Sequence, residues 1–515
     1  MTIIPDLLRS RAREFPDNTA VQIEDGERRT FKELDVLSSK IANLLLKEGL
    51  KKQDKVSCAI PNAEGIYYIA SYFGTQKAGG VFVPVNVRYS REEVEKQLTH
   101  SDTSFLLAED GLLRGWGIAG DAGAAGRAKV LTLSRVKEML GGLSGSDPEV
   151  QVNEDDPAEL IYTSGTTGIP KGVMVTHHAI TSFDETPWVQ LFSGRTALHP
   201  VPLYTFAGMT MTVLPLRLGM KCILMKRFDA HRFADLLEKE QVFSVYAVSS
   251  MWLIVLKEVP DLKKRDFSNL LFLQFGAAPM PPSAVLELSD LFTQANVINL
   301  YGLTESGAAG YMMPFGEARS RPNSVGKPVD ENTEIRILDE RGNALPPGQP
   351  GEILLRSRDL RTRRRYYKDD AATQQVWDTE GWVRTGDIGY VDGDGYLYLV
   401  DRKKDVINRG GYKISSLEVE DALFQHPSVK EVAVVGVPHP VLIEDCVAFI
   451  VAKEGREPTE EELRTFLLGK LADYKVPRQY HFMSELPKNA VGKVLKRELR
   501  DRVTNKRPDG GNHGV

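Results

Sequence analysis

A loop crowded with small and hydroxylated residues joins two strand-like segments at residues 162–172. Glycine lets backbone N–H groups approach an anion closely, hydroxyl groups add further donors, and a lysine adds a mobile positive charge. The residues that supply these groups are Ser164, Gly165, Thr166, Thr167, Gly168 and Lys171. The combination predicts a loop that wraps a polyphosphate between strands of an α/β protein.

Two better-known phosphate loops do not fit this segment. A Walker A loop places Lys directly after Gly and opens a helix, whereas Ile169 and Pro170 intervene here and 173–175 has a strand pattern. The dinucleotide pattern G-x-G-x-x-G is also absent. An ordinary Ser/Thr/Gly surface loop is the alternative, but the density of phosphate-binding groups favours a nucleotide, and we expect ATP.

Helical and strand patterns alternate along the chain, which is typical of the α/β fold class. Apolar residues recur at helical spacing from Leu34 to Leu45 behind Thr30, a potential N-cap, and 55–60 follows as a buried strand. Further strands are predicted at 81–83, 160–162, 222–224 and 271–273, with a helix at 230–240. The segment 117–126, which is rich in small residues, predicts a surface connection.

A domain boundary is predicted just after Arg402, because the elements become shorter beyond it. They are a hairpin around Gly410 and Gly411, a helix at 416–424, strands at 432–437 and 447–451, and a helix at 459–471. Residues 1–402 would form a large α/β domain of several subdomains, and residues 403–515 a small α+β domain. The polar, Gly-rich segment 507–515 is predicted to be disordered.

Charge and cysteine content exclude several classes of protein. The net charge of -5 and the pI near 6.1 imply no basic face of the size that nucleic acid requires. Cys58, Cys222 and Cys446 are scattered, which predicts a reducing compartment and no disulfide framework. The adjacent pair 177–178 predicts the start of an element rather than a zinc site. No long apolar run suggests a membrane span, so we expect a soluble, cytoplasmic protein.

Five further motifs follow the loop in a defined order. They are Phe275-Gly-Ala-Ala-Pro279, Asn299-Leu-Tyr-Gly-Leu-Thr-Glu-Ser306, Trp382-Val-Arg-Thr-Gly-Asp387, Asp401-Arg-Lys-Lys-Asp405 and Pro487-Lys-Asn-Ala-Val-Gly-Lys493. Together with the loop they resemble the adenylate-forming (ANL) superfamily of acyl-CoA synthetases, adenylation domains and luciferases. The resemblance covers nearly the whole chain, and six motifs in series are far more specific than one.

The resemblance implies a site for ATP and AMP. In that site Tyr301 would stack on adenine, Ala277 and Ala278 would line its other side, and Asp387 would accept hydrogen bonds from ribose hydroxyls. The implied set is Thr163, Ser164, Gly165, Thr166, Thr167, Gly168, Lys171, Ala277, Ala278, Asn299, Tyr301, Gly302, Thr304, Asp387 and Arg402.

The resemblance also implies three catalytic residues. A carboxylate that attacks the α-phosphate brings two anions together. For one such pair of charges about 4 Å apart, at an effective dielectric of about 20, the repulsion costs on the order of 4 kcal/mol. Lys493 of the C-terminal domain would stabilise the charge of the transition state, Thr304 would donate to the α-phosphate, and Glu305 would bind Mg²⁺. The substrate carboxylate is already ionised, so no general base is needed.

Relatives in this superfamily bring a thiol to the same carbon by rotating the C-terminal domain, which acts as a mobile lid. Lys404 falls at their hinge position, and Gly410 and Gly411 fall at their pantetheine channel for CoA. Tyr474 is a candidate for packing on the adenine of CoA, although core packing is an equal alternative. The implied partners are a small carboxylic acid and CoA or a carrier protein, for a protein that is a monomer or homodimer.

Two stretches depart from the family pattern. Within the acyl-pocket segment formed by Tyr204, Thr205 and Phe206, Thr205 stands where many relatives have histidine. The smaller side chain predicts more room and hence a bulky alicyclic or aryl acid. The arginine-rich run 361–365 stands where relatives often carry glycine before tyrosine, and it is interpreted as a solvated charge run, with attraction of CoA phosphates or an acidic partner as the alternative.

The leading interpretation is an ATP-dependent acid:CoA ligase that forms an acyl-AMP, releases pyrophosphate and then makes a CoA thioester. An adenylating enzyme that loads the phosphopantetheine of a carrier protein is an alternative. A non-catalytic AMP-binding relative is disfavoured by the presence of Lys171, Glu305, Asp387 and Lys493. A luciferase-like use of the same chemistry stays open.

Overall fold

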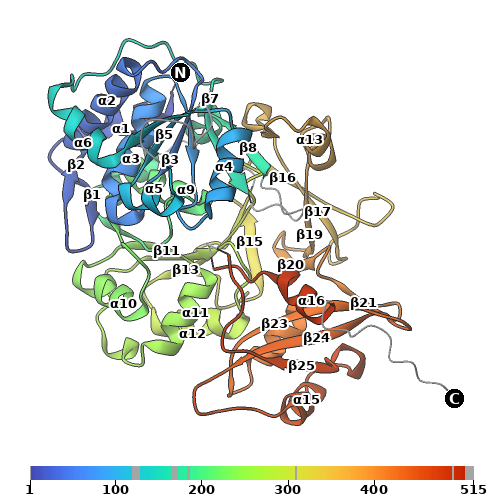
Figure 1. Ribbon diagram of the computed structural model, residues 1–515. Coiled ribbons are helices and arrows are strands. Elements are labelled where there is room, and N and C mark those ends of the chain that lie inside the picture. Colours follow the sequence, from blue (N-terminus) through green and yellow to red (C-terminus); the bar gives the residue numbers. More distant parts are fainter. Residues whose placement is uncertain are drawn as a thin grey trace.

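The computed structural model describes residues 2–118, 128–163, 171–182, 186–307, 310–489 and 492–504. Within these ranges the strands form three sheets (Figure 1). Two sheets build the N-terminal part of the chain, and the third builds the small C-terminal part, drawn in orange and red. The described residues contain no helix with the length and apolar character needed to cross a membrane.

The first sheet carries the predicted phosphate loop. Its order is β18-β8-β7-β4-β3-β5-β6, and the strands from β7 to β6 are parallel. The strands are β3 (Lys55–Ala59), β4 (Val81–Pro84), β5 (Thr103–Ala108), β6 (Lys129–Thr132), β7 (Pro157–Thr163), β8 (Lys171–Thr176) and β18 (Arg365–Tyr366). The helices of this part are α1 (Ile4–Glu14), α2 (Phe31–Lys47), α3 (Gly65–Lys77), α4 (Arg91–His100), α5 (Asp110–Trp116), α6 (Leu133–Met139) and α7 (His177–Thr181).

The second sheet changes character halfway across. Its order is β16-β17-β19-β20-β15-β14-β13-β12-β11-β9-β10-β1-β2, with parallel pairing from β13 to β1 and antiparallel pairing from β13 to β16. Its strands are β1 (Thr19–Ile23), β2 (Arg28–Thr30), β9 (Thr196–His199), β10 (Lys221–Leu224), β11 (Ser244–Val248), β12 (Phe272–Gly276), β13 (Asn296–Tyr301), β14 (Tyr311–Met312), β15 (Ser324–Pro328), β16 (Thr333–Leu338), β17 (Gly351–Ser357), β19 (Val383–Val391) and β20 (Leu397–Arg402). The associated helices are α8 (Thr186–Phe192), α9 (Phe206–Arg217), α10 (Ala230–Lys239), α11 (Ser249–Glu258), α12 (Pro282–Leu291) and α13 (Asp370–Val376).

The third sheet lies in the lid and has its own hydrophobic core. Strand β20 of the large domain ends at Arg402, and the lid sheet begins at Ile407. The lid strands are β21 (Ile407–Arg409), β22 (Tyr412–Ile414), β23 (Val429–His439), β24 (Ile443–Ala452) and β25 (Gln479–Phe482), and the lid helices are α14 (Ser416–Phe424), α15 (Glu460–Leu468) and α16 (Lys496–Thr504). Buried residues such as Val434, Cys446 and Leu463 pack together in the lid core.

Local sequence signals predict these elements well. Thr30 caps α2 and forms a capping box with Glu33, so the predicted helix start is confirmed. The adjacent histidines begin α7, and the hairpin around Gly410 and Gly411 is formed by β21 and β22, as expected. Most of the predicted connection at 117–126 and all of the tail at 507–515 lie outside the described residues.

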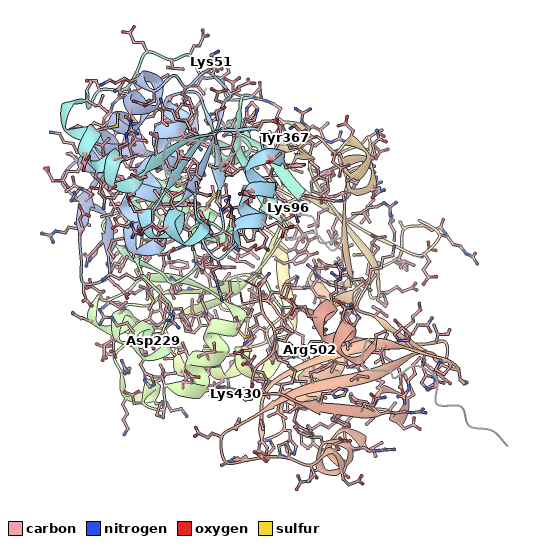
Figure 2. The ribbon with its side chains drawn as sticks, in the orientation of Figure 1. Lys51, Lys96, Asp229, Tyr367, Lys430 and Arg502 are labelled. Carbon is pink, nitrogen blue, oxygen red and sulfur yellow. The ribbon has the colours of Figure 1, made fainter. Side chains whose placement is uncertain are left out.

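Helix α11 lies at the junction between the two domains and contacts the lid at both of its ends. At its start, a Cβ added to Gly492 would come 2.6 Å from the Ser250 hydroxyl, and Gly492 has a left-handed φ of 75°, so glycine suits this close approach. At its end, Lys257 donates to the carbonyl of Lys430 and lies 4.3 Å from the centre of the Phe424 ring. Figure 2 labels Lys430 at this junction.

Candidate functional site

A cleft of about 460 Å³ opens between the large domain and the lid. The large domain contributes the ends of β12 and β13, residues of β19 and β20, and one face of α11. The lid contributes residues of α14, β23 and α16 and the loop before α16. The predicted site residues that line it are Ala277, Ala278, Asn299, Tyr301, Gly302, Asp387, Arg402, Lys404 and Lys493. The carboxyl ends of parallel strands are the usual place for a ligand in an open α/β sheet.

Tyr301, Asp387 and Arg402 form a hydrogen-bonded group on one wall of the cleft. The Tyr301 hydroxyl donates to Asp387 Oδ2 at 2.8 Å, and Arg402 Nε lies 3.3 Å from Asp387 Oδ1. Asp387 and Arg402 face each other directly in the β19–β20 ladder. Burial raises the pKa of Tyr301 well above its ordinary value, and the neighbouring Asp387 adds to the effect. The phenol therefore stays protonated and holds the carboxylate in one orientation.

The predicted adenine-lining residues follow β12 in a constrained turn. Ala277 adopts a left-handed φ of 65°, which is uncommon for a residue with a Cβ. The Ser249 hydroxyl donates to the Ala278 carbonyl at 2.6 Å, which ties this turn to the start of α11. Asn299 also lines the cleft, and its amide donates to the carbonyl of Ser324 at 3.2 Å. The turn is thus tied to α11, and the neighbouring Asn299 side chain is held by β15.

Lys493 reaches the same cleft from the lid. Burial lowers the pKa of Lys493 to about 8, and the positive charges of Arg402 and Lys404 lower it further against the opposing effect of Asp387 and Asp405. A lysine held in this way loses hydration and faces neighbours of its own charge, so an incoming anion would relieve both penalties. The structure brings the predicted catalytic lysine together with the predicted ribose-site residues.

The turn that follows β13 carries the remaining catalytic candidates. The Tyr366 hydroxyl donates to Glu305 Oε1 at 2.9 Å, and the Thr163 hydroxyl lies 3.5 Å from the same oxygen. The Trp377 indole donates to the Glu305 carbonyl at 3.3 Å. Lys171 Nζ lies 4.9 Å from the centre of the Tyr366 ring. Glu305 and Lys171 therefore meet at one tyrosine, and Thr163, at the other end of the loop, contacts Glu305.

The prediction of a solvated charge run at 361–365 is wrong for Arg364. This side chain is buried, its Nη1 donates to the Thr304 carbonyl at 2.5 Å, and its guanidinium lies 5.3 Å from the centre of the Phe206 ring. Burial lowers the pKa of Arg364 to about 10, although Glu159 and Glu305 oppose the shift. Arg364 thus belongs to the environment of the Thr304–Glu305 turn.

Sequence reasoning missed Arg364 and Tyr366. In the structure the side chains from 361 to 366 alternate strictly between exposed and buried, with Thr362, Arg364 and Tyr366 inside, whereas the residues of this run show no matching alternation of polarity. A period of two is the pattern of a strand, and β18 is indeed a short strand paired with β8. The charge of the run concealed this alternation.

The residues around Glu305 fit the binding of Mg²⁺ on a nucleotide. The described residues contain no cluster of three or more His, Cys, Asp or Glu side chains that could hold a metal by themselves. Mg²⁺ is usually bound through one or two carboxylates together with substrate phosphates. Glu305, close to the hydroxyl of Thr163 and joined through Tyr366 to Lys171, supplies such a carboxylate beside the predicted phosphate loop.

Several predicted residues lie away from the cleft or outside the described part of the chain. Residues 164–168 of the loop are not described. Gly410 and Gly411 form the tip of the β21–β22 hairpin with φ values of 61° and 94°, and in Figure 1 β21 extends away from α10, α11 and α12. Tyr474 stacks on Tyr412 with ring centres 4.6 Å apart and packs against the lid core. The predicted CoA channel is therefore separate from Lys493 in this arrangement.

The acyl-pocket candidates surround the start of α9. Tyr204 is buried, and Phe206 is the first residue of the helix. The Thr205 hydroxyl caps α9 by accepting a hydrogen bond from the backbone N–H of Gly208 at 2.9 Å. Thr205 therefore has a structural role at the start of α9.

Comparisons with known proteins agree over the whole length. The family described as AMP-binding enzyme matches residues 8–367, and the AMP-binding enzyme C-terminal domain matches residues 418–493. Fatty acid–[acyl-carrier-protein] ligase ScoC of Streptomyces coeruleorubidus is 33% identical, over 95% of this chain and 94% of that protein. Feruloyl-CoA synthase of an Amycolatopsis species is 35% identical, over 96% of this chain and 97% of that protein.

Two solved structures of one relative superimpose on the present structure to different extents. ATP-bound MatB from Rhodopseudomonas palustris is 26% identical and superimposes with a TM-score of 0.87, over 97% of this chain and 99% of that chain. Apo MatB has the same identity and coverage but a TM-score of 0.76. The present structure is closer to the ATP-bound form. On its motifs, its two-domain architecture and these matches, the chain belongs to the AMP-binding enzyme family.

Proposed function

We propose that this protein is an ATP-dependent carboxylic acid:CoA ligase that works in two steps through an acyl-AMP. The observation that carries the proposal is the presence of Lys493 in one cleft with Tyr301, Asp387 and Arg402. Relatives that match nearly the whole chain include a feruloyl-CoA synthase and a long-chain-fatty-acid–CoA ligase from Bacillus subtilis. ATP and CoA would then be substrates, together with a carboxylic acid.

In the first step the protein would position two anions and compensate their charge. Asp387 would hold the ribose of ATP, since its carboxylate is already oriented by Tyr301 and Arg402. Lys493 would place its ammonium group against the charge that develops between carboxylate and α-phosphate. Glu305 would hold Mg²⁺, which supplies positive charge to the phosphates when it is bound.

The second step would require the lid to turn. Gly410 and Gly411 lie at a hairpin tip that does not line the cleft, whereas Lys493 does. A CoA thiol and Lys493 would approach the same carbon, so one arrangement cannot serve both steps. Lys404, which lines the cleft beside the last strand of the large domain, is the residue about which we expect the rotation. The closeness to an ATP-bound relative supports assigning the present arrangement to the first step.

Pyrophosphate release with a panel of acids tests the proposal. We expect release with ATP and a bulky acid such as benzoate or ferulate, at a rate at least about tenfold above that with acetate, because Thr205 leaves more room than histidine. Each acid is assayed with CoA and separately with a phosphopantetheinylated carrier protein, since one relative is an acyl-carrier-protein ligase. If acetate outperforms every larger acid, the assignment of the acyl pocket is contradicted. If the thioester forms only on the carrier protein, the carrier protein and not CoA is the acceptor.

The charge of Lys493 predicts a pH dependence of acyl-AMP formation. Its pKa of about 8 means that the ammonium is present below pH 8 and is lost as the pH rises through that value. Since kcat/KM reports the pKa values of the free enzyme, we expect kcat/KM to fall about tenfold per pH unit above that point. Lys493→Arg keeps its charge, so this variant should lack the alkaline fall even if its rate is lower. A wild-type profile that stays flat to about pH 10 would argue against the assignment.

A further inference from the structure

The short strand β18 joins two parts of the site that are far apart in sequence. Its residues Arg365 and Tyr366 pair with Met174 and Val173 of β8, the strand that begins at Lys171. The inward side chains of this segment then meet the turn after β13. Arg364 holds the carbonyl of Thr304 through a hydrogen bond of 2.5 Å. The segment 362–366 thus connects the end of the phosphate loop to the Thr304–Glu305 turn.

Tyr366 makes the contacts that link the two charged groups. Its hydroxyl donates to Glu305 Oε1 at 2.9 Å, and its ring centre lies 4.9 Å from Lys171 Nζ. The ring itself is held by Trp377, with ring centres 4.9 Å apart at an interplanar angle of 75°. Tyr366 is 7% exposed, so its position is determined by packing. The phenol therefore offers a rigid reference point for both side chains.

The chemistry of the contacts suits this task. A glutamate has three side-chain torsions, and a hydrogen bond from a buried phenol to one carboxylate oxygen restricts them. A lysine ammonium over an aromatic face is attracted to the ring at distances within about 6 Å. One rigid side chain can in this way hold an anion and a cation at a defined separation before a triphosphate arrives.

We propose that Tyr366 is a positioning residue, whose hydroxyl orients Glu305 and whose ring orients Lys171 for the triphosphate of ATP. This inference rests on the proposed function, because it assigns the two charges to one polyphosphate. Tyr366 acts through these two residues and touches no reacting atom. Its loss should affect acyl-AMP formation and ATP binding, and should not affect the thioester step.

The neighbouring residue offers a matched control. Tyr367 also donates its hydroxyl to a carboxylate, Asp102 Oδ2, at 2.8 Å, and Figure 2 labels it on the large domain. We expect Tyr366→Phe to slow acyl-AMP formation by about tenfold or more, because a hydrogen bond to a charged group is lost, while Tyr367→Phe stays within about twofold of the wild type. Thioester formation from supplied acyl-AMP should be unchanged in both variants.

A binding measurement gives a second readout that does not depend on turnover. Titration calorimetry of ATP is run on both variants in Mg²⁺ and in EDTA. Tyr366→Phe should raise the Kd for ATP about tenfold in Mg²⁺ and much less in EDTA, because Glu305 is the group that loses its orientation. Equal effects of the two substitutions, or equal loss in both half-reactions with a lowered Tm, would overturn the inference. If the wild type forms no acyl-AMP from any acid, the proposed function fails. The ATP affinities measured by calorimetry would still test whether Tyr366 positions Glu305 and Lys171.

Discussion

Replacing Lys493 by alanine is expected to slow acyl-AMP formation by about 10²–10³-fold, the effect of removing one donor aimed at developing charge. Lys493 is a lid residue that shares the cleft with Tyr301, Asp387 and Arg402. Its ammonium is poorly hydrated there, and burial lowers its pKa to about 8. Because the attacking carboxylate and the α-phosphate are both negative, losing this cation leaves their repulsion uncompensated.

The same substitution should spare the second half-reaction. In the proposed mechanism, thioester formation from supplied acyl-AMP and CoA would use a rotated lid, in which Lys493 would not be needed. The two half-reactions are measured separately, as isotope exchange between pyrophosphate and ATP and as thiol consumption. Lys488→Ala serves as the control, because Lys488 also lines the cleft and pairs with Glu431 at 2.5 Å. Equal loss of both half-reactions in Lys493→Ala would contradict the role of the lid.

Replacing Glu305 by glutamine is expected to slow acyl-AMP formation by about 10²-fold and to raise the Mg²⁺ concentration needed for half-maximal rate. The amide has the same shape but lacks the charge that attracts a divalent cation. The hydrogen bond from Tyr366 at 2.9 Å can persist, so the fold of the turn should be retained. Thermal unfolding of the variant therefore checks that the loss is local.

The Mg²⁺ dependence is the decisive measurement for Glu305. Initial rates are recorded over a series of Mg²⁺ concentrations at saturating ATP, and ATP binding is titrated with and without the ion. Glu340→Gln is the control, because the Glu340 side chain is 91% exposed and lies in a turn of the large domain. A variant with reduced rate but an unchanged Mg²⁺ requirement would remove Glu305 from the metal site.

The elements of this fold follow from local physics, and this is why so many of them were predictable. The cap of α2 at Thr30 and the period of its apolar residues act within a few turns of helix. The buried strands and the glycine hairpin of the lid are likewise short-range patterns. Charge density misled the prediction only at 361–365, where alternation places Arg364 inside against Thr304 and Arg365 outside.

The site needed more than local pattern. Motif residues gave the chemistry of the nucleotide site, because small residues, hydroxyls, a carboxylate and lysines suit a polyphosphate wherever they occur. Nothing local predicts that Tyr366 links Glu305 to Lys171, because those three residues come from separate strands and a turn.

By itself, the sequence determined the fold class, the helices and strands with a clear periodic pattern, and the kinds of groups available for catalysis, since these depend on neighbours in the chain. Only the tertiary structure decided that Lys493 lies in the cleft with Asp387 while Gly410 and Gly411 lie outside it. That choice depends on how the lid packs against α11, through Gly492 at one end and Lys257 at the other. Contacts between distant segments are set by packing and by rotation at a hinge, and neither produces a periodic pattern of residues in the sequence.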